Sequence, residues 1–166
     1  MARGVTGLVS IGVDLVEHST ALGIGSEVGR LRHAVTQAVT FATGTTDGQL
    51  DRVWSDEVSL TTTPTDVDLV GSLTSELTGQ TTSFADVVLI VVRNLSASGN
   101  ILVGGDAASI PLFSAANDVI VVPPGGTLLW YGGNGIAATA TTADILQLAA
   151  STGTVTCGIL FAGRSA

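Results

Sequence analysis

Charge is scarce in this 166-residue chain: charged residues make up 12% of it, and lysine is absent. Six arginines stand against fourteen aspartates and glutamates, so the formal net charge is −8 at pH 7. Recognition of nucleic acid through its phosphates needs a basic surface, and we therefore expect no nucleic-acid partner. The basic cluster Arg30, Arg32 and His33 suits contacts across a protein interface, because arginine keeps its charge and pairs bidentately with carboxylates.

Cysteine and aromatic residues are equally rare. Cys157 is the single cysteine, which excludes an internal disulfide, and its place in the apolar run 154–162 predicts a buried, unreactive thiol. Aromatic residues make up 4% of the chain, so aliphatic side chains must fill the core. A domain of this length buries enough surface to be stable without a disulfide or a metal.

Long apolar runs are missing too. No stretch approaches the roughly 20 apolar residues of a membrane helix. Gly and Thr interrupt the first residues, which lack the apolar core and the cleavage site of a signal peptide. These features predict a protein that is made in the cytoplasm and does not associate with membranes.

Motifs for catalysis or cofactor binding do not occur. The glycines of residues 23–29 (GIGSEVG) have the wrong spacing for a nucleotide-binding loop, and there is neither a nucleophile elbow nor a Walker loop. His18 and His33 alone are too few for a usual zinc site. We therefore expect a protein that is not an enzyme and that carries no cofactor or metal.

Two pairs of acidic residues raise the hypothesis of a bound calcium ion. Asp66 and Asp68 lie at alternate positions of an expected strand, and Asp47 and Asp51 flank an expected turn. Either pair could help to hold calcium together with carbonyl oxygens. Solvated carboxylates at the edge of a sheet are the alternative.

A carbohydrate platform and a glycosylation site are two further hypotheses. Trp130 and Tyr131 lie close to Asn134 and could form a small platform for a sugar, the alternative being a capped end of a sandwich. Residues 94–96 (NLS) match the glycosylation sequon. In a chain without a secretory signal we expect that match to be a coincidence.

Short β-branched runs separated by Gly, Pro, Asn and Ser dominate the second half of the chain. They are residues 86–95 (DVVLIVVRNL), 118–122 (DVIVV), 127–131 (TLLWY), 144–149 (DILQLA) and 154–162 (TVTCGILFA). This pattern is typical of an antiparallel sandwich or barrel. We expect an all-β fold, an antiparallel β-sandwich of eight to ten strands with little helix. Pro124 and Gly125 suit a type II turn, which predicts a hairpin of the runs 118–122 and 127–131.

Two strands give more specific expectations. In residues 51–60 one face carries Trp54, Asp56, Val58 and Leu60 and is expected to be the core face, and the other face carries Val53, Ser55, Glu57 and Ser59. In residues 84–95 both faces of the expected strand are apolar, since successive residues point to opposite faces and the apolar ones fall into two sets: Phe84, Val88, Ile90 and Val92, and Val87, Leu89 and Val91. Such a strand needs a second covering layer, which could be an arm, a loop or another subunit.

The N-terminal part differs from the rest. Residues 1–32 are rich in Gly and show no steady period, which predicts an extended arm with at most one strand; strands integral to the sandwich are the alternative. Residues 34–42 (AVTQAVTFA) alternate and are expected to begin the body. The predicted organisation is an arm over residues 1–32 and a sandwich domain over residues 33–166.

Several segments taken in order carry a resemblance. They are residues 41–48 (FATGTTDG), 51–60 (DRVWSDEVSL), 66–73 (DVDLVGSL), 84–95 (FADVVLIVVRNL), 103–105 (VGG) and 122–126 (VPPGG). Over residues 40–162 the chain resembles the small β-sandwich structural proteins of tailed bacteriophages. The resemblance implies a virion protein without an active site, either in the capsid or in the tail. Decoration (cement) proteins of this group are often trimers that clamp neighbouring major capsid proteins, and N-terminal arms are common in them.

These features together predict a decoration protein on the capsid surface, with a jelly-roll-like body, that stabilises the head. Its expected partners are the major capsid protein and copies of itself, in a homotrimer. A tail, baseplate or fibre protein and, in another class, a carbohydrate-binding module are the alternatives. The residues expected at the capsid and subunit contacts are Val5, Leu8, Val9, Ile11, Val13, Arg30 and Arg32.

Overall fold

The computed structural model describes Val5 and residues 7–19, 29–71, 73–74, 81–112 and 118–165, with the backbone alone for residues 13–19, 29–33 and 35. Within these ranges the fold is all-β and contains no helix, as expected. The strands are β1 (Gly7–Ser19), β2 (Gly29–Thr43), β3 (Gln49–Leu50), β4 (Arg52–Leu60), β5 (Thr65–Asp68), β6 (Leu73–Thr74), β7 (Thr81–Thr82), β8 (Asp86–Asn94), β9 (Ile101–Gly104), β10 (Val119–Val122), β11 (Thr127–Ala137), β12 (Ile145–Ala150) and β13 (Val155–Arg164). The described residues thus form more strands than the eight to ten expected, since the N-terminal part pairs with itself and three strands have only two residues.

The chain divides into two compact units. One is Thr6–Phe41, and the other is Ala42–Ala166 together with Met1–Val5. The first unit is an antiparallel hairpin of β1 and β2, in register from Gly7 opposite Phe41 to Ser19 opposite Gly29. Residues 34–41 therefore pair with the N-terminal strand, whereas the sequence pattern placed them at the start of the body and put the boundary at residue 32. Alternation along a strand does not identify its partner.

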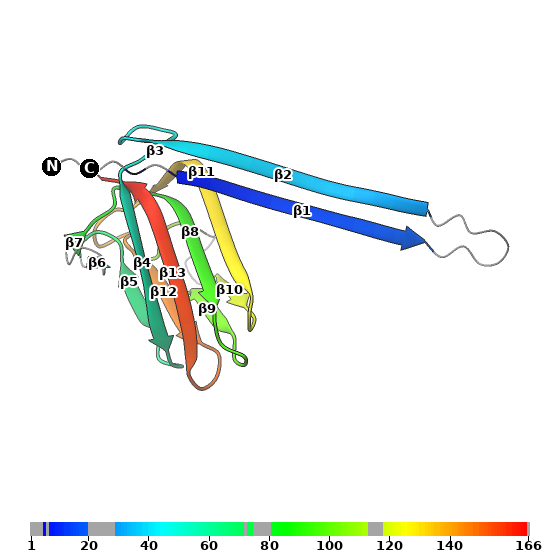
Figure 1. Cartoon of the computed structure of the whole chain (residues 1–166). Coiled ribbons are helices and arrows are strands. Elements are labelled where there is room, and N and C mark those ends of the chain that lie inside the picture. Colours follow the sequence, from blue (N-terminus) through cyan, green and yellow to red (C-terminus); the bar gives the residue numbers. More distant parts are fainter. Residues whose placement is uncertain are drawn as a thin grey trace. The chain divides into compact units, whose positions relative to one another are not determined.

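The second unit, called the body below, contains two four-stranded sheets. Their orders are β11-β8-β13-β4 and β10-β9-β12-β5 (Figure 1). Four antiparallel pairs are nested in these sheets: β4 with β13, β5 with β12, β8 with β11, and β9 with β10. The first strand of the set thus pairs with the last, the second with the last but one, and so on inward.

Side chains from both sheets meet in one apolar core. Phe161 of β13 stacks on Trp54 of β4, with ring centroids 5.5 Å apart, and meets the edge of Phe84 at 6.4 Å. Trp54 and Leu60 are buried and Val58 packs against the same cluster, so the predicted core face of β4 is confirmed. Aliphatic residues fill most of the remainder: Val67, Leu69, Leu73, Val87, Ile90, Val92, Ile101, Val103, Ile110, Val122, Leu146, Leu148, Val155 and Ile159.

The turn at Pro123–Gly126 connects the two sheets. Gly125 has a φ of +70°, and the amide of Gly126 donates to the carbonyl of Pro123 at 2.8 Å, so the predicted turn is present. The predicted hairpin is wrong, because β10 pairs with β9 in one sheet and β11 pairs with β8 in the other. A tight turn reverses the chain, but it does not oblige its two strands to share a sheet.

Candidate functional site

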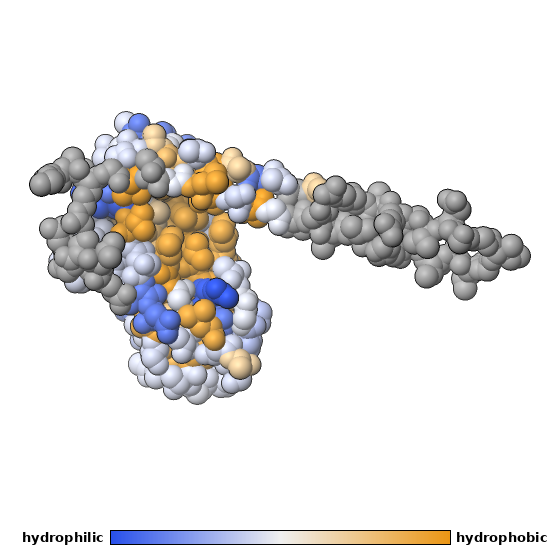
Figure 2. All heavy atoms as spheres, in the orientation of Figure 1, coloured by the Kyte–Doolittle hydropathy of each residue, from blue (hydrophilic) through white to orange (hydrophobic). Residues whose placement is uncertain are grey.

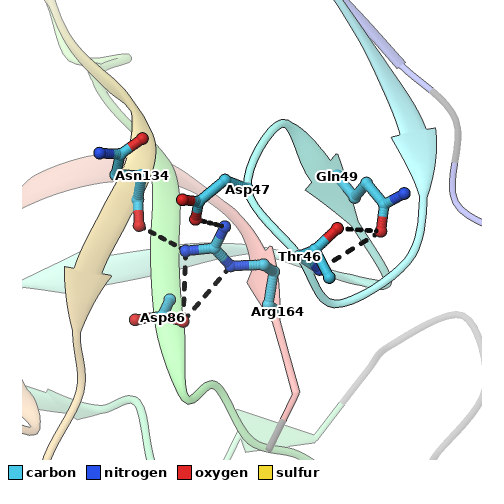
Figure 3. A network of polar contacts seen from close by, with 6 residues as sticks. All are labelled: Thr46, Asp47, Gln49, Asp86, Asn134 and Arg164. Carbon is cyan, nitrogen blue, oxygen red and sulfur yellow. Dashed lines mark hydrogen bonds and ion pairs between the residues drawn. The ribbon is translucent and has the colours of Figure 1, made fainter.

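Arg164 is the centre of the most connected polar cluster of the body. Its side chain is 4% exposed, and its Nη1 donates to Oδ1 of Asp47 at 2.8 Å. Nε donates to Oδ2 of Asp86 at 3.3 Å, and Nη2 lies 3.2 Å from the same oxygen. Nη2 also donates to the carbonyl of Asn134 (Figure 3). The guanidinium thus joins the end of β13 to the start of β8, to β11 and to the loop before β3.

This cluster holds a loop in place. The side chain of Gln49 accepts through Oε1 from the backbone amide and the hydroxyl of Thr46, at 3.3 and 2.8 Å. The backbone amide of Gln49 donates to the carbonyl of Thr46. Asp47, in that loop, is bound to Arg164. On the other strand, residues 132–135 interrupt the pairing of β11 with β8 between Tyr131 and Ile136. Gly135 has a φ of +73°, which lets the bulge turn so that the carbonyl of Asn134 meets the guanidinium. We interpret the cluster as structural.

The first acidic pair is occupied by protein groups. Asp47 accepts from Arg164, while Asp51 accepts from the amide and hydroxyl of Ser165 at 2.7 and 2.6 Å. Nη1 of Arg52 lies 3.2 Å from Oδ2 of Asp51. The two carboxylates therefore serve different partners.

The second acidic pair is divided in the same way. Asp66 accepts from Nε2 of Gln147 at 2.9 Å, and that amide also reaches Asp106 at 3.4 Å. Asp68 accepts from the amide of Val70 at 2.8 Å. Among the residues that the structure describes, no group of three or more His, Cys, Asp or Glu side chains is placed to hold a metal ion. The calcium hypothesis thus gains no geometric support from either pair.

Cys157 and Asn94 are buried structural residues. Burial raises the pKa of the Cys157 thiol to about 12, which confirms the prediction of a buried thiol and keeps it protonated at neutral pH. Nδ2 of Asn94 donates to the carbonyls of Gly99 and Val122 at 2.9 and 3.1 Å, and its Oδ1 accepts from the amide of Ser96. The amide nitrogen that a glycan would need is therefore enclosed in the folded protein, in agreement with the expectation that the sequon is a coincidence.

The residues of the hypothetical sugar platform do not lie on one face of β11. Trp130 packs against the core, and a Cβ added at Gly132 would lie 2.8 Å from its ring. Tyr131 is the next residue of β11 and so points to the opposite face. Asn134 uses its carbonyl to hold Arg164. The three residues do not form one stacking surface.

An apolar patch lies on the side of the sheet β11-β8-β13-β4 that faces away from the core. We call it the outer apolar face: Val53, Leu89, Val91, Leu95, Leu129, Leu160 and Ala162. In register, Val91 lies between Leu129 and Leu160, and Ala162 lies between Leu89 and Val53. Leu89 and Ala162 are buried, whereas Val53 and Leu129 are 42% and 39% exposed. The predicted strand with two apolar faces is confirmed.

Polar residues mark one end of this patch. Arg93 and Glu57 lie on either side of Gly158 in the register of the sheet. Figure 2 shows apolar side chains gathered over the sheet, with hydrophilic residues below them in the view. An exposed apolar area with a polar rim is the usual form of a protein contact surface.

A second apolar stretch lies at the edge of the other sheet. Val119, Ile120 and Val121 of β10 are all exposed, and β10 is the terminal strand of its sheet. Exposed edge strands offer unpaired backbone groups as well as apolar side chains. The sequence pattern predicted a strand here but not its exposure, because exposure depends on the position of the strand at the edge of the sheet.

The contact residues predicted in the arm belong to different parts of the structure. Leu8 is 64% exposed and Ile11 is 37% exposed, while Val9 is half-buried. Val5 is in the body unit, where its carbonyl accepts from the hydroxyl of Thr43 at 2.8 Å. For Val13, Arg30 and Arg32 the structure describes the backbone: they pair with Val35, His18 and Val16. The glycine run 23–29 lies outside the described residues except for Gly29.

Comparisons with family models, with curated proteins and with solved structures give no match to this chain. In the described part of the chain, no helix is long and apolar enough to cross a bilayer. The candidate site is therefore defined by surface chemistry alone: an outer apolar face, an exposed edge strand and an unusually long hairpin.

Proposed function

We propose that the protein is a structural component of a bacteriophage virion, a decoration protein that binds between major capsid proteins and stabilises the head. The observation that carries this proposal is the outer apolar face, which includes residues of all four strands of a sheet whose other face packs against the core. Such a face favours a role in assembly over chemistry.

We also propose that the body is a jelly-roll sandwich. The nested pairing of the eight strands of its two four-stranded sheets, first with last and inward from there, supports this assignment. That order results when one long hairpin is rolled up, and double-sheet jelly rolls of this kind are used by viral capsid proteins. The topology supports the fold assignment and says nothing of the partner.

The low charge of the chain fits contact between packed subunits. A surface rich in Thr and Ser is cheaper to desolvate than one rich in lysine and glutamate. A decoration protein that binds only the assembled shell would stabilise it by mass action, and the stabilisation grows with the logarithm of the ratio of its concentration to its dissociation constant. We expect it on the outside of the capsid, bound to the major capsid protein.

Binding to purified, expanded heads of a phage that encodes the chain tests this function. We expect the wild-type protein to sediment with the heads. The variant Val53→Asn, Leu129→Asn removes two exposed apolar side chains, and we expect it to bind at least about tenfold more weakly. The control variant Ser59→Asn, Thr127→Asn changes two exposed polar residues of the same sheet and should bind as the wild type does.

The other candidate functions predict different results. Binding of the wild type to isolated tails but not to heads would overturn the decoration role in favour of a tail, baseplate or fibre protein. Binding to neither, with saturable binding on a glycan array, would favour a carbohydrate-binding module. Equal loss of binding in the control variant would show that the outer apolar face is not the contact.

A further inference from the structure

The hairpin of β1 and β2 is long for a structure with only two strands. It has thirteen paired positions from Gly7 opposite Phe41 to Ser19 opposite Gly29, which corresponds to about 40 Å of strand. In the described residues, β1 pairs with β2 alone, and β2 has another neighbour only at its end, where Ala42 and Thr43 pair with β3. An isolated two-stranded hairpin is at best marginally stable in water, so a hairpin of this length needs further strands beside it.

The register places aliphatic residues opposite each other on one face. Val9 lies opposite Val39, and the next pair on this face is Ile11 with Gln37. Val9 and Val39 are half-buried and Ile11 is more than one-third exposed. At the next alternate position the register pairs Val13 with Val35. The opposite face is smaller and more polar, with Ser10 opposite Ala38 and Gly12 opposite Thr36.

Charge is balanced in the paired strands of the hairpin. The paired strands contain two acidic residues, Asp14 and Glu17, both on β1, and two arginines, Arg30 and Arg32, both on β2. The whole net charge of −8 therefore lies outside these strands. A basic partner would be drawn to the acidic remainder of the chain, whereas a hairpin with one acidic and one basic strand is complementary to itself.

Rotational symmetry would bring these charges together. In a ring of copies, the free edge of β1 meets the free edge of β2 of the next copy, antiparallel and at the same height along the ring axis. Arg30 is level with His18 and Arg32 with Val16. Asp14, level with Ala34, belongs to the same face of the hairpin as Arg32, so Asp14 of one copy would lie at the position diagonal to Arg32 of its neighbour. Edge-to-edge pairing would also satisfy the backbone groups that an edge strand leaves free.

From this geometry we propose that the hairpins of several copies of this chain pair edge to edge into a closed β-ring, with the Val9–Ile11–Val39 face turned inward. The occupant of the hairpin surface is a second copy of the same chain. This self-association goes beyond the proposed binding to capsids and does not depend on it, because the ring forms between free copies in solution.

Light scattering coupled to size exclusion, with the full chain at several concentrations, tests the ring. We expect the wild type to be an oligomer. Arg30→Glu with Arg32→Glu places like charges on both edges and should raise the dissociation constant at least about tenfold. Adding Asp14→Arg and Glu17→Arg to that variant exchanges the charges of the two edges and should restore the oligomer.

A second pair of variants tests the apolar face. Ile11→Asn with Val39→Asn should dissociate the oligomer, whereas Leu8→Asn, at an exposed position of the other face, should leave it intact. Unfolding of the body, followed by tryptophan fluorescence, should not change in any of these variants, since both tryptophans are in the body. A monomeric wild type, or an oligomer that survives both the charge reversal and the Ile11–Val39 changes, would overturn the proposal; neither result depends on whether capsids are bound.

Discussion

The hairpin and the body differ in what covers the apolar faces of their strands. In the body, each four-stranded sheet has the other sheet as its second layer, and side chains of both sheets share one core. The hairpin contains pairing of the same antiparallel kind, but the exposed fractions of Leu8 and Ile11 are 64% and 37%. Hydrogen-bonded pairing alone therefore does not make a stable unit: a layer must cover one face. The body supplies this layer from its own chain, and we propose that other copies supply it to the hairpin.

Removal of a core aromatic should give the largest difference between the two regions. Phe161→Ala deletes a fully buried ring that contacts Trp54 and Phe84, and we expect the free energy of unfolding of the body to fall by about 3–5 kcal/mol. Ile11→Ala in the hairpin should change the same quantity by less than about 0.5 kcal/mol. Urea unfolding followed by tryptophan fluorescence measures both. Similar losses in the two variants would mean that the hairpin contributes to the stability of the body.

Loss of the buried guanidinium should have the next largest effect. Arg164→Met keeps much of the volume but removes the bonds to Asp47, Asp86 and the carbonyl of Asn134, and we expect destabilisation of about 2–3 kcal/mol. The matched control is Arg52→Met. Arg52 is 41% exposed and paired with Asp51, so its loss should cost less than about 1 kcal/mol. A smaller effect at Arg164 than at Arg52 would contradict the structural role of the cluster.

Asn94 provides a test within the body that has no equivalent in the hairpin. Asn94→Ala leaves the carbonyls of Gly99 and Val122 and the amide of Ser96 without this partner, and we expect a loss of about 1–3 kcal/mol in unfolding free energy. Asn134→Ala is the control, because Asn134 holds Arg164 through its backbone carbonyl; it should stay within about 0.5 kcal/mol. Thermal or urea unfolding measures both changes, and equal effects would show that the buried amide is not important.

The smallest effect at neutral pH is expected at Cys157. Its pKa is raised to about 12 by burial, so the unfolded chain loses the thiol proton at lower pH than the native protein does. The thiol contribution to stability is therefore complete below the ordinary thiol pKa and declines as the pH rises towards the native value. We expect no reaction of the native protein with iodoacetamide at pH 8 and rapid reaction in urea. The stability of Cys157→Val should decline less between pH 9 and pH 11 than that of the wild type, and an equally steep decline would contradict this assignment.

Several features of the fold could be predicted from local sequence. The alternation in residues 51–60 identified the core face of β4, and the apolar residues 87–92 indicated that both faces of β8 are apolar. Pro124 and Gly125 predicted the turn that the structure contains. Each of these is a property of a few adjacent residues, since the direction of a side chain and the sign of φ depend mainly on near neighbours.

The candidate site was less predictable. The arm residues Leu8 and Ile11 were selected as contact residues because they are apolar and lie outside the regular pattern, and both are exposed. The outer apolar face was anticipated only at β8, since Leu129 and Val53 join it through the register of neighbouring strands. The exposed run in β10 was missed, because an apolar strand at the edge of a sheet has the same sequence pattern as one at its centre.

What the sequence by itself determined is the β-structure, the places where the chain turns, the scarcity of charge and the absence of a recognisable catalytic motif. Only the tertiary structure decided which strands are partners: β1 for residues 34–41, β9 rather than β11 for β10, and Arg164 for the carboxylates of Asp47 and Asp86, 117 and 78 residues away. The physical reason is that every strand edge offers the same backbone donors and acceptors. The choice between partners depends on side-chain packing across the whole body, and a window of neighbouring residues does not contain that information.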